Sequence, residues 1–150
     1  MNSGERERGA GALRPDRGLI GLRNGHLIAT IPVRDRNRAQ AFYMDVLGLE
    51  FEAASIAGVL LRAGAERILL FESSAPPPAQ TLVGFEVEQL EPVIAELTER
   101  GVIFEDYDYP TLRTVNQIAW IGPERAAWFR DSEGNVLSIS EPWRTDPAGS

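Results

Sequence analysis

The chain holds a single histidine, and its surroundings bear on which chemistry the sequence supports. His26 opens the stretch HLIATIPVRD, where apolar and β-branched residues follow the pattern of a buried strand. An imidazole titrates near neutral pH and also binds metals, so His26 is a candidate general base or metal ligand. Alternation along a strand places Thr30 on the same face as His26.

Carboxylates and a phenol on other predicted strands extend this set. Glu72 and Glu86 end two of those strands, and with His26 they make up a candidate oxygen and nitrogen metal site. Glu86 and Tyr107 are also candidate acid–base groups. The sequence favours the plainer interpretation of His26 and Glu72, in which both are solvated at strand ends.

Aromatic residues in the second half of the chain are candidates for a binding wall. Tyr107 and Tyr109 flank Asp108 in EDYDYP, and alternation places both rings on one face, where they are suited to stack on a planar ligand. Trp120 and Trp128 lie on predicted strands, and either is a candidate floor for a pocket, with Trp120 preferred. Ordinary strand packing explains these residues as well, and this alternative stays open.

Composition narrows the classes of function. The 150 residues carry a net charge of −7, which argues against nucleic-acid binding, and they contain no cysteine, which suits a reducing cytoplasm. No apolar run has the length of a membrane span, and the first residues lack the apolar core of a secretory signal. We expect a flexible extension over residues 1–22 and a loose tail over residues 145–150.

The predicted elements repeat once along the chain. Each half begins with a strand, continues with a helix and ends with three strands, and the proline-rich stretch SSAPPPAQ joins the halves. Val33 corresponds to Val87 at an offset of 54, and Gly48 corresponds to Gly101 at 53. We interpret this as an internal duplication. It predicts an α+β fold of two tandem βαβββ modules, at about 23–75 and 80–144 within a domain over 23–144, whose curved mixed sheets pair around a central cavity.

Three stretches in this order resemble the vicinal oxygen chelate superfamily, which includes glyoxalases, bleomycin-resistance proteins and dioxygenases. They are IPVRDRNRAQAFYMDVLGLEF, GFEVEQLEPVIAELTERGVIFE and AAWFRDSEGNVLSISEP. The resemblance covers roughly residues 25–142. One departure is Ser132, where the family often has proline in its F-x-D-P-x-G-N ending.

The resemblance implies metal-ligand positions on the first and last strands of each module. Here these positions hold Ile28, Leu70, Leu82 and Ser138, where the family has histidine or glutamate. Aliphatic side chains offer no lone pair to a divalent ion. The sequence is therefore identified with a metal-free branch of the family, without a metal or another cofactor.

We expect a metal-independent protein that binds a small organic molecule, aromatic or cationic, in a cleft between the modules. The resemblance also implies a homodimer. One alternative is a cofactor-free isomerase, lyase or cyclase that uses acid–base residues of the same cleft, and another is a metal-dependent lyase with displaced ligands. The expected ligand-binding residues are Ile28, Thr30, Leu70, Leu82, Tyr107, Tyr109, Trp120 and Ser138.

Overall fold

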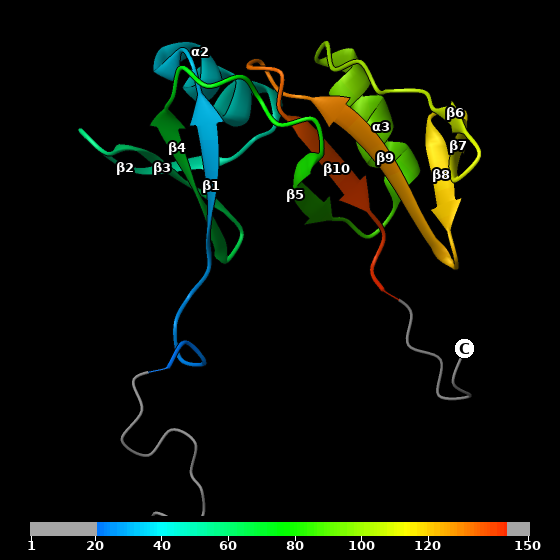
Figure 1. The fold of residues 1–150 in the computed structure, drawn as a ribbon, viewed down its shortest axis with the longest axis horizontal. Helices are drawn as coiled ribbons and strands as arrows, with labels where there is room; N and C mark the ends of the chain where they lie inside the picture. The colour runs from blue at the N-terminus through cyan, green and yellow to red at the C-terminus, as the bar shows by residue number, and fades with distance from the viewer. Residues whose placement is uncertain (1–20, 144–150) are drawn as a thin grey trace, which may run out of the picture.

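Two β-sheets and two helical segments make up residues 21–143, the part of the chain that a computed structural model describes (Figure 1). The extension expected over residues 1–22 lies outside the described residues except for Gly21 and Leu22. The tail expected over residues 145–150 lies outside them entirely. Both sheets have the mixed strand pairing that two βαβββ modules produce, so the α+β fold class is confirmed.

The first module follows the predicted order of elements. They are β1 (Ile28–Val33), α2 (Arg36–Ala41), the wider helical turn η1 (Phe42–Val46), β2 (Glu50–Ser55), β3 (Gly58–Ala63) and β4 (Glu66–Glu72). Its strands lie in the order β1-β4-β3-β2, with β1 parallel to β4. Because parallel neighbours need a long connection, the helix and the β2–β3 hairpin separate them in sequence.

The second module repeats this order and adds strands at its outer edge. Its elements are β5 (Thr81–Glu86), α3 (Leu90–Glu99), β6 (Asp108–Tyr109), β7 (Leu112–Val115), β8 (Ile118–Ile121), β9 (Glu124–Arg130) and β10 (Val136–Ser140). The order is β5-β10-β9-β8-β7-β6, with β5 parallel to β10. In Figure 1 the edge strands β1 and β5 are turned toward each other, with the extra strands at the far right.

Local signals explain where the first helix begins and ends. Asp35 has an extended backbone, and its carboxylate accepts a hydrogen bond of 3.0 Å from the Arg38 N–H, which makes it the predicted N-cap. At the other end Gly48 has a φ of 83°, a left-handed conformation that glycine adopts without strain.

The second helix is capped from a distance. Gln89 precedes it but makes no side-chain capping bond. Instead Glu141, which follows β10, accepts a hydrogen bond of 3.1 Å from the Leu90 N–H. The carboxylate meets the first free N–H group of α3, where a negative charge is favourable.

One hydrophobic core connects the two modules. Its largest fully buried side chains come from both halves, with Ile31, Tyr43 and Leu61 from the first and Phe129 and Leu137 from the second. A second, smaller cluster lies on the other face of the second sheet. Its buried members are Ala119, Ala126, Trp128 and Val136, and Tyr107 and Leu112 pack against them.

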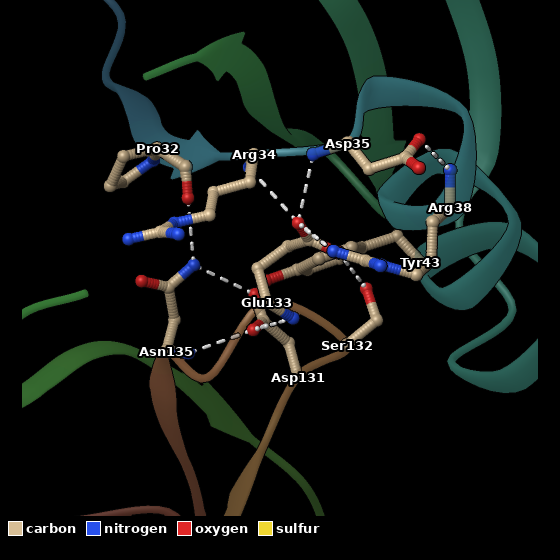
Figure 2. A network of polar contacts seen from close by, with 9 residues as sticks. All are labelled: Pro32, Arg34, Asp35, Arg38, Tyr43, Asp131, Ser132, Glu133 and Asn135. Carbon is tan, nitrogen blue, oxygen red and sulfur yellow. Dashed lines mark hydrogen bonds and ion pairs between the residues drawn. The ribbon is translucent and has the colours of Figure 1, made fainter. Parts of the chain in front are cut away.

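A buried polar junction also ties the modules together, and Figure 2 shows it from close by. The Tyr43 hydroxyl donates a hydrogen bond of 2.6 Å to Asp131. The Asn135 side-chain amide donates to the Pro32 carbonyl at 2.9 Å and to Asp131 at 2.9 Å. Because the Pro32 carbonyl lies on an edge strand, Asn135 satisfies an acceptor that no neighbouring strand reaches.

Glu133 forms the outer part of this junction. Its carboxylate accepts bonds of 2.8 and 3.0 Å from the Arg38 guanidinium, and others of 2.9 and 3.0 Å from the backbone N–H groups of Arg34 and Asp35. The Ser132 hydroxyl donates to it as well. The sequence motifs FY and FRDSEGN, which are far apart in the chain, therefore meet in one network.

One predicted strand is much shorter than expected. The sequence pattern suggests a strand over 102–109, but only a single bridge from Phe104 to Phe129 and the two-residue β6 form there. The reason is competition for one edge, because β8 pairs with the first half of β9 and leaves only its end to the Phe104 segment.

Candidate functional site

A cleft of about 870 Å³ lies between the modules. It opens where the start of β1, the turn between β3 and β4, and the strand β5 come together. We call it the intermodule cleft. Its size falls within the roughly 300–1,000 Å³ that is usual for small-molecule sites.

The cleft has an apolar floor contributed by both modules. The floor residues are Ala29, Leu47, Leu49, Ile68, Val83, Phe85 and Val87. All of them belong to the hydrophobic core or pack against it, so the cleft exposes an edge of that core. A smaller hollow of about 160 Å³ continues toward α3 and shares Leu47, Leu49, Phe85 and Val87 with the cleft.

Charged side chains line the rim of the cleft. The Arg62 guanidinium forms an ion pair of 2.9 Å with Glu50, and Arg67 forms one of 3.3 Å with Glu52. Glu66 and Glu86 also line the cleft, and neither has an ion pair among residues 21–143. The rim therefore offers two carboxylates without a counter-ion above an apolar floor.

The first sheet places two expected ligand-binding residues together and a third elsewhere. Ile28 and Thr30 share a face of β1, and Ile28 is 40% exposed. Leu70 pairs with Ile31 and is fully buried in the core, so it lies on the other face of the first sheet from Ile28. The residues of β4 on the face of Ile28 and Thr30 are Arg67, Leu69 and Phe71. Alternation defines which residues of one strand share a face, whereas the register of β4 against β1 decides which residues of the two strands share one.

The two expected ligand-binding residues of the β5–β10 pair, Ser138 and Leu82, lie in different surroundings. Ser138 pairs with Gly84, and a Cβ atom on Gly84 would lie 2.8 Å from the Ser138 hydroxyl, so both face the same side. Leu82 lies at a break in the pairing of β5 with β10, where it has no partner, and it packs half-buried against the core. The bulge is the reason that simple alternation does not describe Leu82.

The two tyrosines do lie on one face, as alternation indicates. The Tyr107 and Tyr109 rings stack with centroids 5.9 Å apart, and Tyr107 also meets Trp128 edge-on at 5.6 Å. Burial raises the pKa of Tyr107, and the nearby Glu105 carboxylate adds to the shift, which keeps the hydroxyl protonated and unsuited as a base.

Trp120 lies on the opposite face of the second sheet from these tyrosines, so the three rings do not line one wall. Its partner across the β8–β9 pair is Arg125, whose guanidinium bonds to Glu91 of α3. Trp120 is thus on the helix side of the sheet. The tryptophan beside the tyrosines is Trp128, which pairs with Ser138 of β10.

The candidate metal site is not assembled. His26 is exposed and precedes β1, whereas Glu72 pairs with Val33 at the far end of that strand. Within residues 21–143 no group of three histidine, cysteine, aspartate or glutamate side chains is arranged to hold a metal ion. The positions where the resemblance to the family implies ligands include Ile28 and Leu82, which offer no donor atoms, so these residues do not fit a divalent ion.

Of the expected site residues, only Glu86 lines the intermodule cleft. The floor of the cleft could not be predicted from the sequence. It consists of core residues from strand ends and from the turn after η1, and these residues form no polar motif. The one signal present was Arg62, which stands among apolar residues of β3 and reaches the rim.

Comparisons with known proteins agree with this architecture. The family model described as "Glyoxalase/Bleomycin resistance protein/Dioxygenase superfamily" matches residues 25–139. No curated protein sequence matches the chain significantly. Within the described residues, no helix is long and apolar enough to cross a membrane.

Solved structures with this fold differ widely in their stated roles. TnmS3, an antibiotic binding protein from Streptomyces sp. CB03234, is 23% identical, with 80% of this chain and 97% of that chain covered and a TM-score of 0.58. A lactoylglutathione lyase from Agrobacterium tumefaciens is 19% identical, with coverages of 79% and 93% and a TM-score of 0.57. The oxidase ChaP-H2 is 18% identical, with coverages of 83% and 98% and a TM-score of 0.63. At these identities the likeness shows the fold alone.

Proposed function

Because the chain belongs to the Glyoxalase/Bleomycin resistance protein/Dioxygenase superfamily, we propose that it is a metal-independent protein that binds a small organic molecule in the intermodule cleft. The observation that carries this proposal is a cleft of about 870 Å³ with an apolar floor and a charged rim. Apolar surface supplies affinity, and a few polar groups fix orientation. Binding alone needs no metal, so it tolerates aliphatic residues at Ile28 and Leu82.

The lining favours an aromatic ligand with a protonated amine. The Phe85 side chain on the floor suits an aromatic ring, which it can meet edge-on or offset-stacked. Glu66 and Glu86 have no counter-ion among the described residues, so they suit a cationic group at the rim. An antibiotic binding protein among the structures with this fold supports a binding role for such a site.

A thermal-shift screen tests the proposal. The probes are matched aromatic amines, aromatic acids and neutral aromatics, each measured with and without EDTA. A ligand at about a hundred times its dissociation constant adds roughly 2.7 kcal/mol of stability, which is readily visible in a domain of this size. We expect amines to raise the melting temperature and EDTA to have no effect. A binding signal that disappears with EDTA would contradict metal independence.

A cofactor-free isomerase, lyase or cyclase is the second candidate, and one observation favours it. The Glu86 carboxylate lines the cleft and has no ion pair among residues 21–143, so it is placed to exchange a proton with a bound molecule. Glu86→Gln separates the two functions. In an enzyme it removes turnover of a cleft ligand, whereas in a binding protein the native chain shows no turnover and the variant only binds an amine more weakly.

We also infer a homodimer in a reducing compartment such as the cytoplasm. Apolar side chains at the edges of the first sheet are left uncovered, with Leu27 88%, Ile28 40% and Phe51 48% exposed. A second copy that covered them would remove this surface from water. Sedimentation equilibrium tests the assembly, and a monomer at micromolar concentration would contradict it. The lack of cysteine supports the compartment.

A further inference from the structure

A second hollow, of about 770 Å³, lies on the helix side of the second sheet. We call it the tryptophan hollow. Its lining includes Trp120 of β8, Trp143 of the segment after β10, and the carboxylates of Glu88, Glu91 and Glu141 around Arg125. It shares no lining residue with the intermodule cleft.

Both tryptophans in this hollow are exposed far more than packing would require. Trp120 is 62% and Trp143 is 78% exposed, whereas Trp128 on the other face of the sheet is 8% exposed. Large aromatic rings are usually well buried, so two exposed ones in a single concavity indicate a binding surface.

The hollow is also negatively charged. Arg125 is fully engaged, with bonds of 2.6 and 2.9 Å to Glu91 and of 3.0 and 2.5 Å to Glu141. The hydrogen bonds from Arg125 hold the pKa of Glu91 at about 2, so this carboxylate is ionised at neutral pH. Three carboxylates against one guanidinium leave the lining with a net formal charge of −2.

Glu88 is the carboxylate of the tryptophan hollow that does not bond to Arg125. It is exposed and has no ion pair among residues 21–143. The ring of Trp120 already accepts one cation, since the Arg125 guanidinium carbon lies 5.7 Å from its centroid. The second ring, that of Trp143, has no such partner among the described residues.

We propose that the tryptophan hollow binds a small organic cation, a quaternary or protonated amine, between the exposed indole rings with Glu88 as its counter-ion. Aromatic faces attract such cations through their quadrupole, and the attraction grows when the site is partly shielded from water. The net charge of the lining favours a cation over an anion or a neutral molecule of the same shape. This site is independent of the cleft and of the ligand proposed for it.

Titration of the full chain with choline tests the proposal, with 3,3-dimethylbutan-1-ol as its uncharged isostere. Tryptophan fluorescence and calorimetry report binding, at constant ionic strength. We expect saturable binding of choline with a dissociation constant on the order of 1 mM, and at least tenfold weaker binding of the isostere. Equal binding of the two compounds, or no saturable binding of choline, would overturn the proposal.

Variants locate the bound cation. Trp143→Ala and Glu88→Gln are exposed changes, and we expect them to weaken choline binding by about tenfold and about fivefold, respectively. Glu99→Gln at the other end of α3 removes the same charge outside the hollow and should leave the affinity unchanged. Phe85→Ala in the intermodule cleft should also have no effect. Loss of choline binding in Phe85→Ala with retention in Trp143→Ala would place the cation in the cleft and refute the proposal.

Discussion

The Tyr43 hydroxyl and the Asp131 carboxylate lie 2.6 Å apart in the buried junction between the modules, although 88 residues separate them in the chain. Asp131 also accepts bonds of 2.8 Å from the backbone N–H groups of Glu133 and Asn135. Burial raises the pKa of Tyr43, and the negative charge of Asp131 acts in the same direction, so the phenol stays a hydrogen-bond donor. One short bond thus links the first helix to the turn before the last strand.

Tyr43→Phe should destabilise the protein by about 1–3 kcal/mol, because Asp131 would stay buried with one donor fewer. Urea unfolding followed by circular dichroism measures the change. Tyr109→Phe is the matched control, since Tyr109 is 57% exposed and its loss of a hydroxyl should change the free energy of unfolding by less than about 0.5 kcal/mol. Equal stability of the two variants would contradict a structural role for the bond.

The free energy of unfolding should fall in acid, in part because the Glu133 carboxylate becomes protonated. The hydrogen bonds from Arg38 hold the pKa of Glu133 at about 2, below its ordinary value of 4.5. A carboxyl group whose pKa is lower in the folded than in the unfolded protein stabilises the folded state at pH values above its unfolded pKa. This contribution is lost as the pH falls from about 4.5 through about 2. Free energies of unfolding measured between pH 6 and pH 2 should show the decline.

Glu133→Gln should make that decline shallower, because it removes one of the titrating groups. Glu91 has a similarly lowered pKa of about 2 and would still contribute, so the decline should persist in part. Glu50→Gln is the control, because it removes the same charge from an exposed ion pair, which contributes little to stability. A Glu133→Gln slope identical to that of the native protein would refute this assignment.

Glu141→Ala should cost about 1–2 kcal/mol of stability, since it removes the carboxylate that caps α3. It also removes one of the two partners of Arg125. Hydrogen exchange of the amides at the start of α3 is the more specific measurement, and we expect protection to fall at Leu90 and the residues that follow. A uniform loss of protection across the whole domain would show that the cap has no local role.

Phe85→Ala should lower the affinity for any amine that binds in the cleft by about tenfold, because it removes the aromatic part of the floor. Phe71→Ala is the matched control: Phe71 is also half-buried on a strand but does not line the cleft. Calorimetric titration of both variants separates the effects. If Phe71→Ala lowers affinity as much as Phe85→Ala, the loss reflects general destabilisation and the cleft is not the site.

EDTA should leave the melting temperature unchanged, as expected for a protein whose family ligand positions hold Ile28 and Leu82. The same measurement with added zinc or manganese should give no stabilisation beyond that of magnesium at equal ionic strength. A saturable increase in melting temperature with one of these ions would point to a metal site and contradict the proposal.

Local sequence patterns were enough to predict much of the architecture. The spacing of glycine stops and strand starts identified a duplicated βαβββ unit, and Asp35 marked a helix start because its carboxylate needs only the neighbouring backbone to form a cap. The shared face of Tyr107 and Tyr109 followed from alternation along one short segment. The lack of donor atoms at Ile28 and Leu82 is likewise visible in the sequence alone.

Only the tertiary structure decided where these patterns meet. Alternation tells which residues of a strand share a face, but the register between strands placed Leu70 in the core and the bulge at Leu82 interrupted the pattern in β5. Trp120 lies on the helix side because β8 pairs Trp120 with Arg125. The cleft and the Tyr43–Asp131 bond depend on packing between the modules. The tryptophan hollow depends on packing within the second module, where α3, β8 and the segment after β10 meet. No local pattern encodes either kind of packing.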